Sequence, residues 1–125
     1  MAAPTIFNDT IQRGDTAVYQ IAGINKVGGP LNLTGAVLRM YAKNRKSDAD
    51  AAAVLRYDSA GLGGIVVNDA GNGLATLTIP FSASLSFTQD TTPLYYDVQV
   101  TEADGTVTTL VEGTLLFQID VTQET

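Results

Sequence analysis

The chain has 125 residues, 13 of them acidic and 7 basic, and it contains no cysteine, histidine or tryptophan. Its net charge of −6 repels nucleic-acid phosphates and anionic lipid headgroups, so neither nucleic acid nor a membrane is an expected partner. Without cysteine the chain has neither disulfides nor thiolate metal ligands. The length fits one domain that covers residues 1–125.

Short segments of alternating apolar and polar residues begin near the N-terminus and predict β-strands. The first two are residues 6–12 and 16–21, and Arg13-Gly14-Asp15 between them predicts a tight turn, although integrins bind the same tripeptide. The next strand is 36–43. Its side chains should alternate, with Leu38, Met40 and Ala42 facing the core and Arg39, Tyr41 and Lys43 facing outward. Residues 47–53 predict one or two helical turns.

The middle of the sequence continues in the same way. Residues 54–58, 64–67 and 74–79 predict three more strands. Residues 68–73, which contain Asn, Asp and two Gly, predict a hairpin turn between the last two of these strands. Residues 81–93 predict a polar connection that includes a 3₁₀ turn.

The last third has the clearest alternation. In the predicted strand 94–101, one face should carry Leu94, Tyr96, Val98 and Val100, and the other Tyr95, Asp97, Gln99 and Thr101. Residues 102–105 end in Asp-Gly and predict a hairpin turn into a partner strand at 106–112. Gly113 should break or bulge the strand before a final strand at 114–122.

These segments amount to seven to nine strands and no long helix, which predicts an all-β fold. Because each sheet must bury its apolar face, two sheets packed as a sandwich are the favoured architecture. The first residues, Met1-Ala2-Ala3-Pro4, have neither a basic region nor an apolar stretch, so we expect no secretory signal there and synthesis in the cytoplasm.

Catalysis is not expected, and we assign no catalytic, cofactor-binding or metal-binding residue. The common nucleophilic triads need a histidine, which the chain lacks. A Ser-Lys pair would have to use Lys43 or Lys46 with Ser47, but these residues lie in a polar stretch typical of a solvated loop. Asp97 is the one acid expected in the middle of a strand, where a bond to Arg39 or Arg56 is its simplest role. A deep pocket lined by converging acids and a lysine would contradict this interpretation.

Aromatic residues are the candidates for a binding surface. We expect Tyr41, Tyr57 and Tyr95 to be exposed on strands, and Phe87 to lie in a loop, where such side chains anchor contacts with proteins or sugars. Ordinary cross-strand packing of the same four side chains is an equally good interpretation.

Several short motifs, in this order, resemble those of one family. They are Arg-Gly-Asp-Thr at 13–16, Gly-Pro-Leu-Asn-Leu-Thr-Gly-Ala at 29–36, Val-Leu-Arg-Tyr at 54–57, Gly-Ile at 64–65, Tyr-Asp-Val-Gln-Val-Thr at 96–101, Asp-Gly-Thr-Val at 104–107, Leu-Val-Glu-Gly-Thr at 110–114 and Asp-Val-Thr at 120–122. In this order the chain resembles the small immunoglobulin-like proteins of tailed-phage particles and is similar to the N-terminal domain of phage baseplate upper proteins. The segment 81–93 departs from that pattern, because it is longer and lacks the usual Gly before the Tyr-rich strand.

The resemblance implies an immunoglobulin-like antiparallel sandwich and a non-enzymatic virion subunit without cofactors. It implies assembly with other phage structural proteins, in multiple symmetric copies, after synthesis in the host cytoplasm. A tail or baseplate adaptor for fibre attachment is the first placement, and capsid decoration is the alternative. Strand addition at an open sheet edge is an expected docking mode. A carbohydrate- or host-surface-binding module is the alternative from another class.

Overall fold

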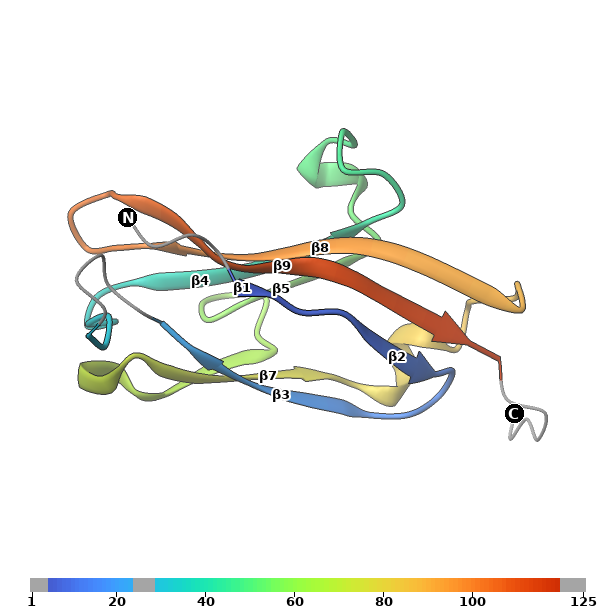
Figure 1. Cartoon of the computed structure of the whole chain (residues 1–125), viewed down its shortest axis with the longest axis horizontal. Coiled ribbons are helices and arrows are strands. Elements are labelled where there is room, and N and C mark those ends of the chain that lie inside the picture. The colour runs from blue at the N-terminus through green and yellow to red at the C-terminus, as the bar shows by residue number, and fades with distance from the viewer. Residues whose placement is uncertain (1–4, 24–28, 120–125) are drawn as a thin grey trace.

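The computed structural model describes residues 5–23 and 29–119 (Figure 1). Nine strands and three single-turn 3₁₀ helices lie in this part of the chain. The strands are β1 (Thr5–Ile6), β2 (Asp9–Gln12), β3 (Ala17–Ala22), β4 (Val37–Lys43), β5 (Leu55–Asp58), β6 (Ile65–Asp69), β7 (Leu74–Ile79), β8 (Thr91–Thr101) and β9 (Val107–Gln118). The 3₁₀ helices are η1 (Asp50–Ala52), η2 (Ala70–Asn72) and η3 (Phe81–Ser84).

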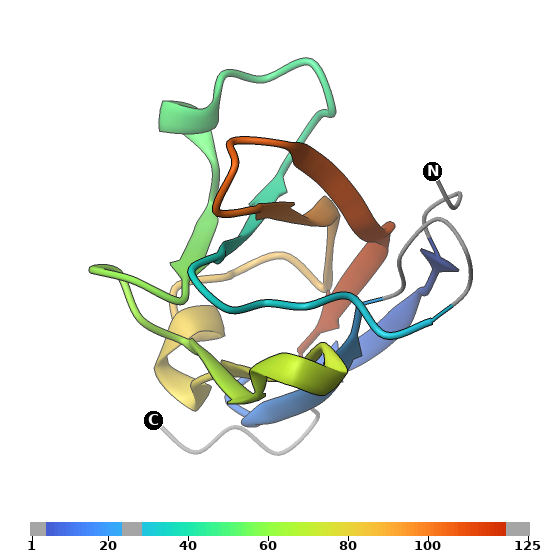
Figure 2. The ribbon, with the colours of Figure 1, turned by 90° about the vertical axis from the view of Figure 1, so that its left-hand side faces the viewer.

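The strands form two sheets that face each other (Figures 1 and 2). The large sheet has the order β1-β9-β8-β4-β5, with β2 also on β9, and the small sheet has the order β3-β7-β6. Both β1 and β2 run parallel to β9, and all other pairings of named strands are antiparallel. The last four strands of the large sheet and the small sheet follow the order G-F-C-C′ and B-E-D of immunoglobulin variable-type domains. The predicted class, an all-β immunoglobulin-like sandwich, is confirmed.

The core lies between the sheets and is built by strict alternation along the long strands. From β4 it receives Leu38, Met40 and Ala42, from β7 Ala75, Leu77 and Ile79, and from β8 Leu94, Tyr96, Val98 and Val100, all of them buried. The facing predicted from the sequence for β4 and β8 is therefore confirmed. The predicted helical turns within 47–53 and 81–93 and the hairpin turn at 68–73 are confirmed as η1, η3 and η2.

Two strand boundaries differ from the prediction around Gly113. The predicted break there is wrong, because β9 continues through it, and the register shift in the β8–β9 pair falls where Val98–Val111 is followed by Gln99–Thr109. Instead, the predicted strand 6–12 is interrupted at Phe7, whose carbonyl oxygen lies against Gly113 so closely that no Cβ would fit. A glycine therefore marks a close approach here and not a strand end.

The first residue of β8 and the last residue of β9 also differ from the predicted limits. Strand β8 begins at Thr91, so it includes Pro93, which was expected in the preceding connection. Pro93 is tolerated because the β4–β8 pairing ends at Tyr95, so no strand on that side needs its missing N–H. Strand β9 ends at Gln118, and the part of the predicted strand 114–122 from residue 120 on lies outside the described residues.

The Arg13-Gly14-Asp15 segment is a turn that joins the two sheets, as predicted. The Asp15 N–H donates to the Gln12 carbonyl, and Gly14 has a φ of 83°. The Arg13 guanidinium donates to the carbonyl oxygens of residues 85 and 87 at 2.6 and 3.1 Å, and the Gly14 N–H donates to the buried hydroxyl of Ser84 at 2.8 Å. The arginine thus holds the η3 segment in place.

Candidate functional site

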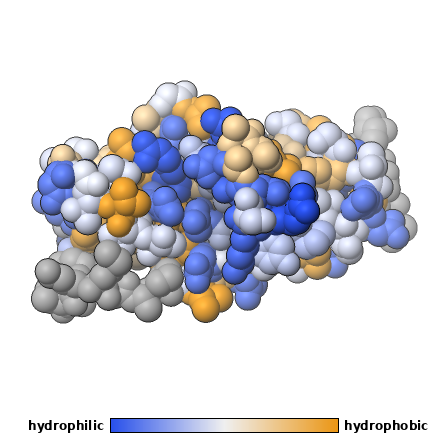
Figure 3. Space-filling model, turned by 90° about the horizontal axis from the view of Figure 1, so that it is seen from above, coloured by the Kyte–Doolittle hydropathy of each residue, from blue (hydrophilic) through white to orange (hydrophobic). Residues whose placement is uncertain are grey.

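The outer face of the large sheet gathers polar and aromatic side chains from neighbouring strands. On this face Tyr41 of β4 lies opposite Asp97 of β8, and Asp97 lies opposite Glu112 of β9. In the same rows Arg39 is opposite Gln99 and Lys43 is opposite Tyr95. These residues share a face because side chains two apart along a strand point the same way. Figure 3 views the molecule from this side and shows a hydrophilic centre.

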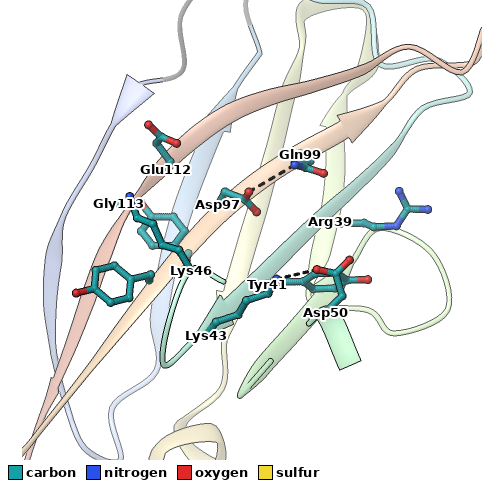
Figure 4. A pocket seen from close by; sticks show the side chains of 11 residues that line it. Arg39, Tyr41, Lys43, Lys46, Asp50, Asp97, Gln99, Glu112 and Gly113 are labelled. Atoms are coloured by element: carbon teal, nitrogen blue, oxygen red, sulfur yellow. Dashed lines mark hydrogen bonds and ion pairs between the residues drawn. The ribbon is translucent and has the colours of Figure 1, made fainter. Parts of the chain in front are cut away.

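An open-sided pocket with a volume of about 460 Å³ lies on this face (Figure 4). We call it the outer pocket. It is lined by Arg39, Tyr41, Lys43, Lys46, Asp50, Tyr95, Tyr96, Asp97, Gln99, Glu112 and Gly113. Two of the four predicted binding residues, Tyr41 and Tyr95, therefore lie in one site.

Charges in the outer pocket are partly paired. The Lys43 ammonium donates to the Asp50 carboxylate and to the carbonyl oxygen of Asp48, both at 2.8 Å. Burial raises the pKa of the Asp97 carboxyl, the positive charge of Lys43 opposes this shift, and the charges of Asp50 and Glu112 add to it. The pocket therefore combines a partly desolvated acid with a lysine that already makes two hydrogen bonds.

Asp97 bonds differently from the prediction. It accepts a hydrogen bond from the side-chain amide of Gln99 at 3.5 Å, while the guanidinium of Arg39 donates to the Thr101 hydroxyl at 2.9 Å. Arg56, the other expected partner, lies over the ring of Tyr41 with 5.7 Å between guanidinium carbon and ring centroid. Asp97 thus keeps acceptor capacity that faces the pocket.

Tyr41 and Tyr95 each have a cation near one ring face. In addition to the Arg56–Tyr41 contact, the Lys46 ammonium lies 5.9 Å from the centroid of Tyr95, which is 39% exposed. Such cation–π contacts hold the rings in position. A ligand would meet pre-oriented rings and carboxylate, amide and guanidinium groups around them.

The other two predicted binding residues lie outside the pocket. Tyr57, expected to be exposed, is half-buried, as is Tyr41, and Phe87 lies in a loop as expected but is half-buried too. Tyr57 is opposite Met40 in the β4–β5 pair, so its ring faces inward, and burial raises the pKa of its hydroxyl. Phe87 packs edge-on against the buried Phe117, with ring centroids 5.1 Å apart. These two rings extend the core, which is the packing alternative stated above.

Nine of the eleven pocket residues were not singled out as binding residues from the sequence, among them Lys43, Lys46, Asp50, Gln99 and Glu112. The signal for two of them was present, because Lys43 and Gln99 share the outward phase of their strands with Tyr41 and Asp97. The register between β8 and β9, which brings Glu112 beside Asp97, has no local signal.

The outer face of the small sheet is different in kind. Its side chains are Val18, Gln20, Ala22, Val66, Asn68, Leu74, Thr76 and Thr78, which are all uncharged. We call this the charge-free face. Asp69, opposite Leu74 at the end of β6, is the one charged residue of the three strands and lies at the border of this face, where its carboxylate accepts bonds from Asn72. Val18 and Val66 are 62% and 61% exposed, so this face presents apolar surface to solvent.

Neither a family model nor a curated protein matches the sequence. Among solved structures the chain is similar to the N-terminal domain of phage TP901-1 ORF48, with 14% identity, a TM-score of 0.44 and coverage of 94% of this chain and 90% of that one. Murine CRIg has 15% identity, a TM-score of 0.39 and coverage of 94% and 93%. AggA, the major subunit of aggregative adherence fimbriae type I from Escherichia coli, has 12% identity, a TM-score of 0.27 and coverage of 94% and 91%. The strand order of the two sheets, and not these low scores, identifies the immunoglobulin-like fold.

The outer pocket brings Asp50, Asp97 and Glu112 together with Lys43 and Lys46, but it is open-sided and not an enclosed cavity. Among the described residues that line the outer pocket there is no Ser, Thr or Cys to act as a nucleophile, and Lys43 is held by Asp50. In the described ranges no three acidic side chains are grouped so as to hold a metal ion. No helix there has the length and apolar character that crossing a membrane requires.

Proposed function

We propose that the chain is a non-enzymatic structural subunit that docks on neighbouring proteins through its charge-free face. The observation that carries this proposal is the division of charge between the two sheets: the outer pocket gathers acids and bases, while the opposite face has eight uncharged side chains. The core of a protein–protein interface is depleted of charged residues in the same way. A face with two valines more than half exposed gains from being covered.

The resemblance in motif order supports a place in a tailed-phage particle, with synthesis in the host cytoplasm. Within the particle we propose a tail or baseplate adaptor that helps to attach a fibre, by analogy with the N-terminal domain of baseplate upper proteins. Capsid decoration is the alternative placement, because a small immunoglobulin-like domain with one docking face also suits the outside of a head. The docked neighbours are then other phage structural proteins, met by several symmetric copies.

Mass spectrometry of purified particles tests the location, and a charged substitution on the charge-free face tests the docking mode. We expect the wild-type chain in the particles and much less of a Val66→Lys variant, because the lysine places a charge in the docking face. Val66 is exposed, so the free protein should tolerate the lysine. Tyr95→Lys on the opposite face is the matched control and should be incorporated normally. A chain that is absent from particles defeats the location, and equal incorporation of both variants defeats the docking face.

One observation favours a second candidate function, a carbohydrate- or host-surface-binding module. Tyr41 and Tyr95 line the same pocket as Asp97 and Gln99, and rings beside carboxylate and amide groups are suited to sugars. A glycan array tests it: binding by the wild type that is lost in Tyr41→Ala and Tyr95→Ala, and kept in Val66→Lys, supports the module. An array without signal for the wild type rules it out.

A further inference from the structure

The small sheet has a second exposed feature besides the charge-free face, which is the outer edge of β3. This strand pairs with β7 on one side, and in the described part of the chain no strand pairs with its other side. Figures 1 and 2 show β3 at the border of its sheet. A strand edge is a row of backbone donors and acceptors that can pair with another chain.

The hydrogen bonds around β3 decide which residues offer these groups. The Gly23 N–H donates to the Gly73 carbonyl at 2.8 Å, which makes 23–73 a bonded pair next to the 22–74 pair of the ladder. Bonded and non-bonded pairs alternate in an antiparallel ladder, so Ile21 and Tyr19 also bond to β7. The backbone groups of Val18, Gln20 and Ala22 therefore point to the free edge. The bond made by Thr78, which is paired with Val18, agrees with this. Its N–H points away from β3 and donates to the carbonyl oxygen of Gly64, which precedes β6.

The other edges have protection that β3 lacks. Strands β1 and β2 are two and four residues long, and β2 begins with Asp9. Strand β5 is four residues long and carries Arg56 and Asp58, and β6 has a register irregularity after Val67 and ends in Asp69. Short length, charge and bulges all discourage edge-to-edge pairing. Strand β3 is six residues long, with the sequence Ala-Val-Tyr-Gln-Ile-Ala, and has neither charge, proline nor bulge.

The distribution of charge limits where two copies of the chain can meet, and it is compatible with pairing at this edge. Each copy carries a net charge of −6, so two copies repel each other over most approaches. Strands β3 and β7 have no charged residue, so two copies that meet along β3 place no charged residues of these strands against each other. Beside β3 there is also an apolar groove of about 420 Å³, lined by residues that include Phe7, Tyr19 and Leu115 and by no charged side chain. A second strand along the edge would cover it.

We propose that two copies pair through β3 in antiparallel fashion about a twofold axis at Gln20, so that the two small sheets form one six-stranded sheet. With Gln20 opposite Gln20 of the second copy, Val18 of each copy lies opposite Ala22 of the other. This register gives three bonded pairs and about six backbone hydrogen bonds. A register centred on Tyr19 gives two such pairs and about four bonds. The Gln20 register also places amide against amide, where each can donate and accept.

This proposal is independent of the location in a phage particle, and its test uses the purified chain. Sedimentation equilibrium of the wild type should give twice the monomer mass of 13.1 kDa. Gln20→Glu and Gln20→Lys should each be monomeric at the same concentration, because like charges then lie directly opposite each other across the axis. An equimolar mixture of the two variants should return to the dimer mass, since each acid then faces a lysine.

Controls separate this pairing from other contacts. Val66→Glu and Val66→Lys place the same charges on the same face but on β6, and both should stay dimeric; if they are monomers, the copies meet face to face and the proposal is wrong. Hydrogen exchange gives a second readout: in the dimer the amides of Val18, Gln20 and Ala22 should be protected, and dilution should release these three while Tyr19 and Ile21 stay protected. A wild type that is monomeric at all concentrations, or a Glu/Lys mixture that stays monomeric, overturns the proposal.

Discussion

The hydroxyl of Tyr96 donates a hydrogen bond to the carbonyl oxygen of Phe7 at 2.7 Å and so ties β8 to the crossing between β1 and β2. The Tyr96 side chain is buried, and a buried hydroxyl needs such a partner. We expect Tyr96→Phe to lower the free energy of unfolding by about 1 kcal/mol, because it leaves the carbonyl without this donor. Urea denaturation measures the effect. Tyr95→Phe, on the exposed face of the same strand, is the control, and an equal loss in both variants would contradict the assignment.

The same hydroxyl makes stability depend on alkaline pH. Burial, with a further contribution from the charge of Asp9, raises the pKa of Tyr96 from 10.0 to about 12. Because the folded state holds the proton more tightly, this contribution is complete below the unfolded pKa and is lost as the pH rises from about 10 to 12. Thermal unfolding across this range should show a steeper decline for the wild type than for Tyr96→Phe. Parallel declines would show that another group is responsible.

Gly113 should not tolerate a side chain. A Cβ at this position would overlap the carbonyl oxygen of Phe7 and lie 2.8 Å from the amide oxygen of Asn8, which itself accepts a hydrogen bond from the Thr114 N–H. We expect Gly113→Ala to cost about 1–3 kcal/mol, since the β1–β2 crossing must move. Gly61→Ala is the matched control, because its Cβ would meet open space. Similar denaturation midpoints for both variants would contradict this close approach.

Asp97 should be a destabilising acid at neutral pH. Its pKa is raised chiefly by burial, against the attraction of Lys43. The native state therefore binds the proton more tightly, and stability falls as the pH rises through the range just above the ordinary pKa of 3.8. Asp97→Asn should raise the free energy of unfolding at neutral pH, by less than about 1 kcal/mol because the group is half exposed. The gain should vanish at about pH 3, where the wild-type carboxyl is protonated. A gain of the same size at both pH values would contradict the cause given.

Phe87 should behave as a core residue and not as a binding residue. Its ring packs edge-on against Phe117, and its carbonyl accepts from Arg13. We expect Phe87→Ala to lower the free energy of unfolding by about 1–3 kcal/mol, less than for a fully buried phenylalanine. Incorporation into particles and any glycan binding should be unchanged while the variant is folded. Tyr41→Ala provides the contrast, since it alters the outer pocket. A stable Phe87→Ala variant with lost binding would contradict the packing role.

The sequence predicted the long strands well because a sheet with one buried face imposes a period of two on its residues, as along β4 and β8. It failed for Tyr57, because the four residues of β5 are too few to show which phase faces inward; only the pairing with Met40 decides it. For Phe87 the choice between contact and packing stayed open, since a connection has no period that would show which way its side chains point.

The outer pocket could be predicted only in part. The outward phase of β4 and β8 identifies Tyr41, Tyr95 and Asp97, but Glu112 joins them through the β8–β9 register. The role of Gly113 depends on a contact with Phe7, more than one hundred positions earlier in the sequence. Contacts between such distant positions have no local pattern, and the same is true of the unpaired edge of β3.

If the chain docks as proposed, the division of charge between the two sheets fixes the orientation of each docked copy. If the charge-free face is attached, the outer pocket must point away from the assembly, towards whatever the assembly meets. Substitutions around Tyr41 and Tyr95 can then change recognition while attachment is preserved. With that orientation the residues of one sheet would determine attachment and those of the other would determine what is contacted outside.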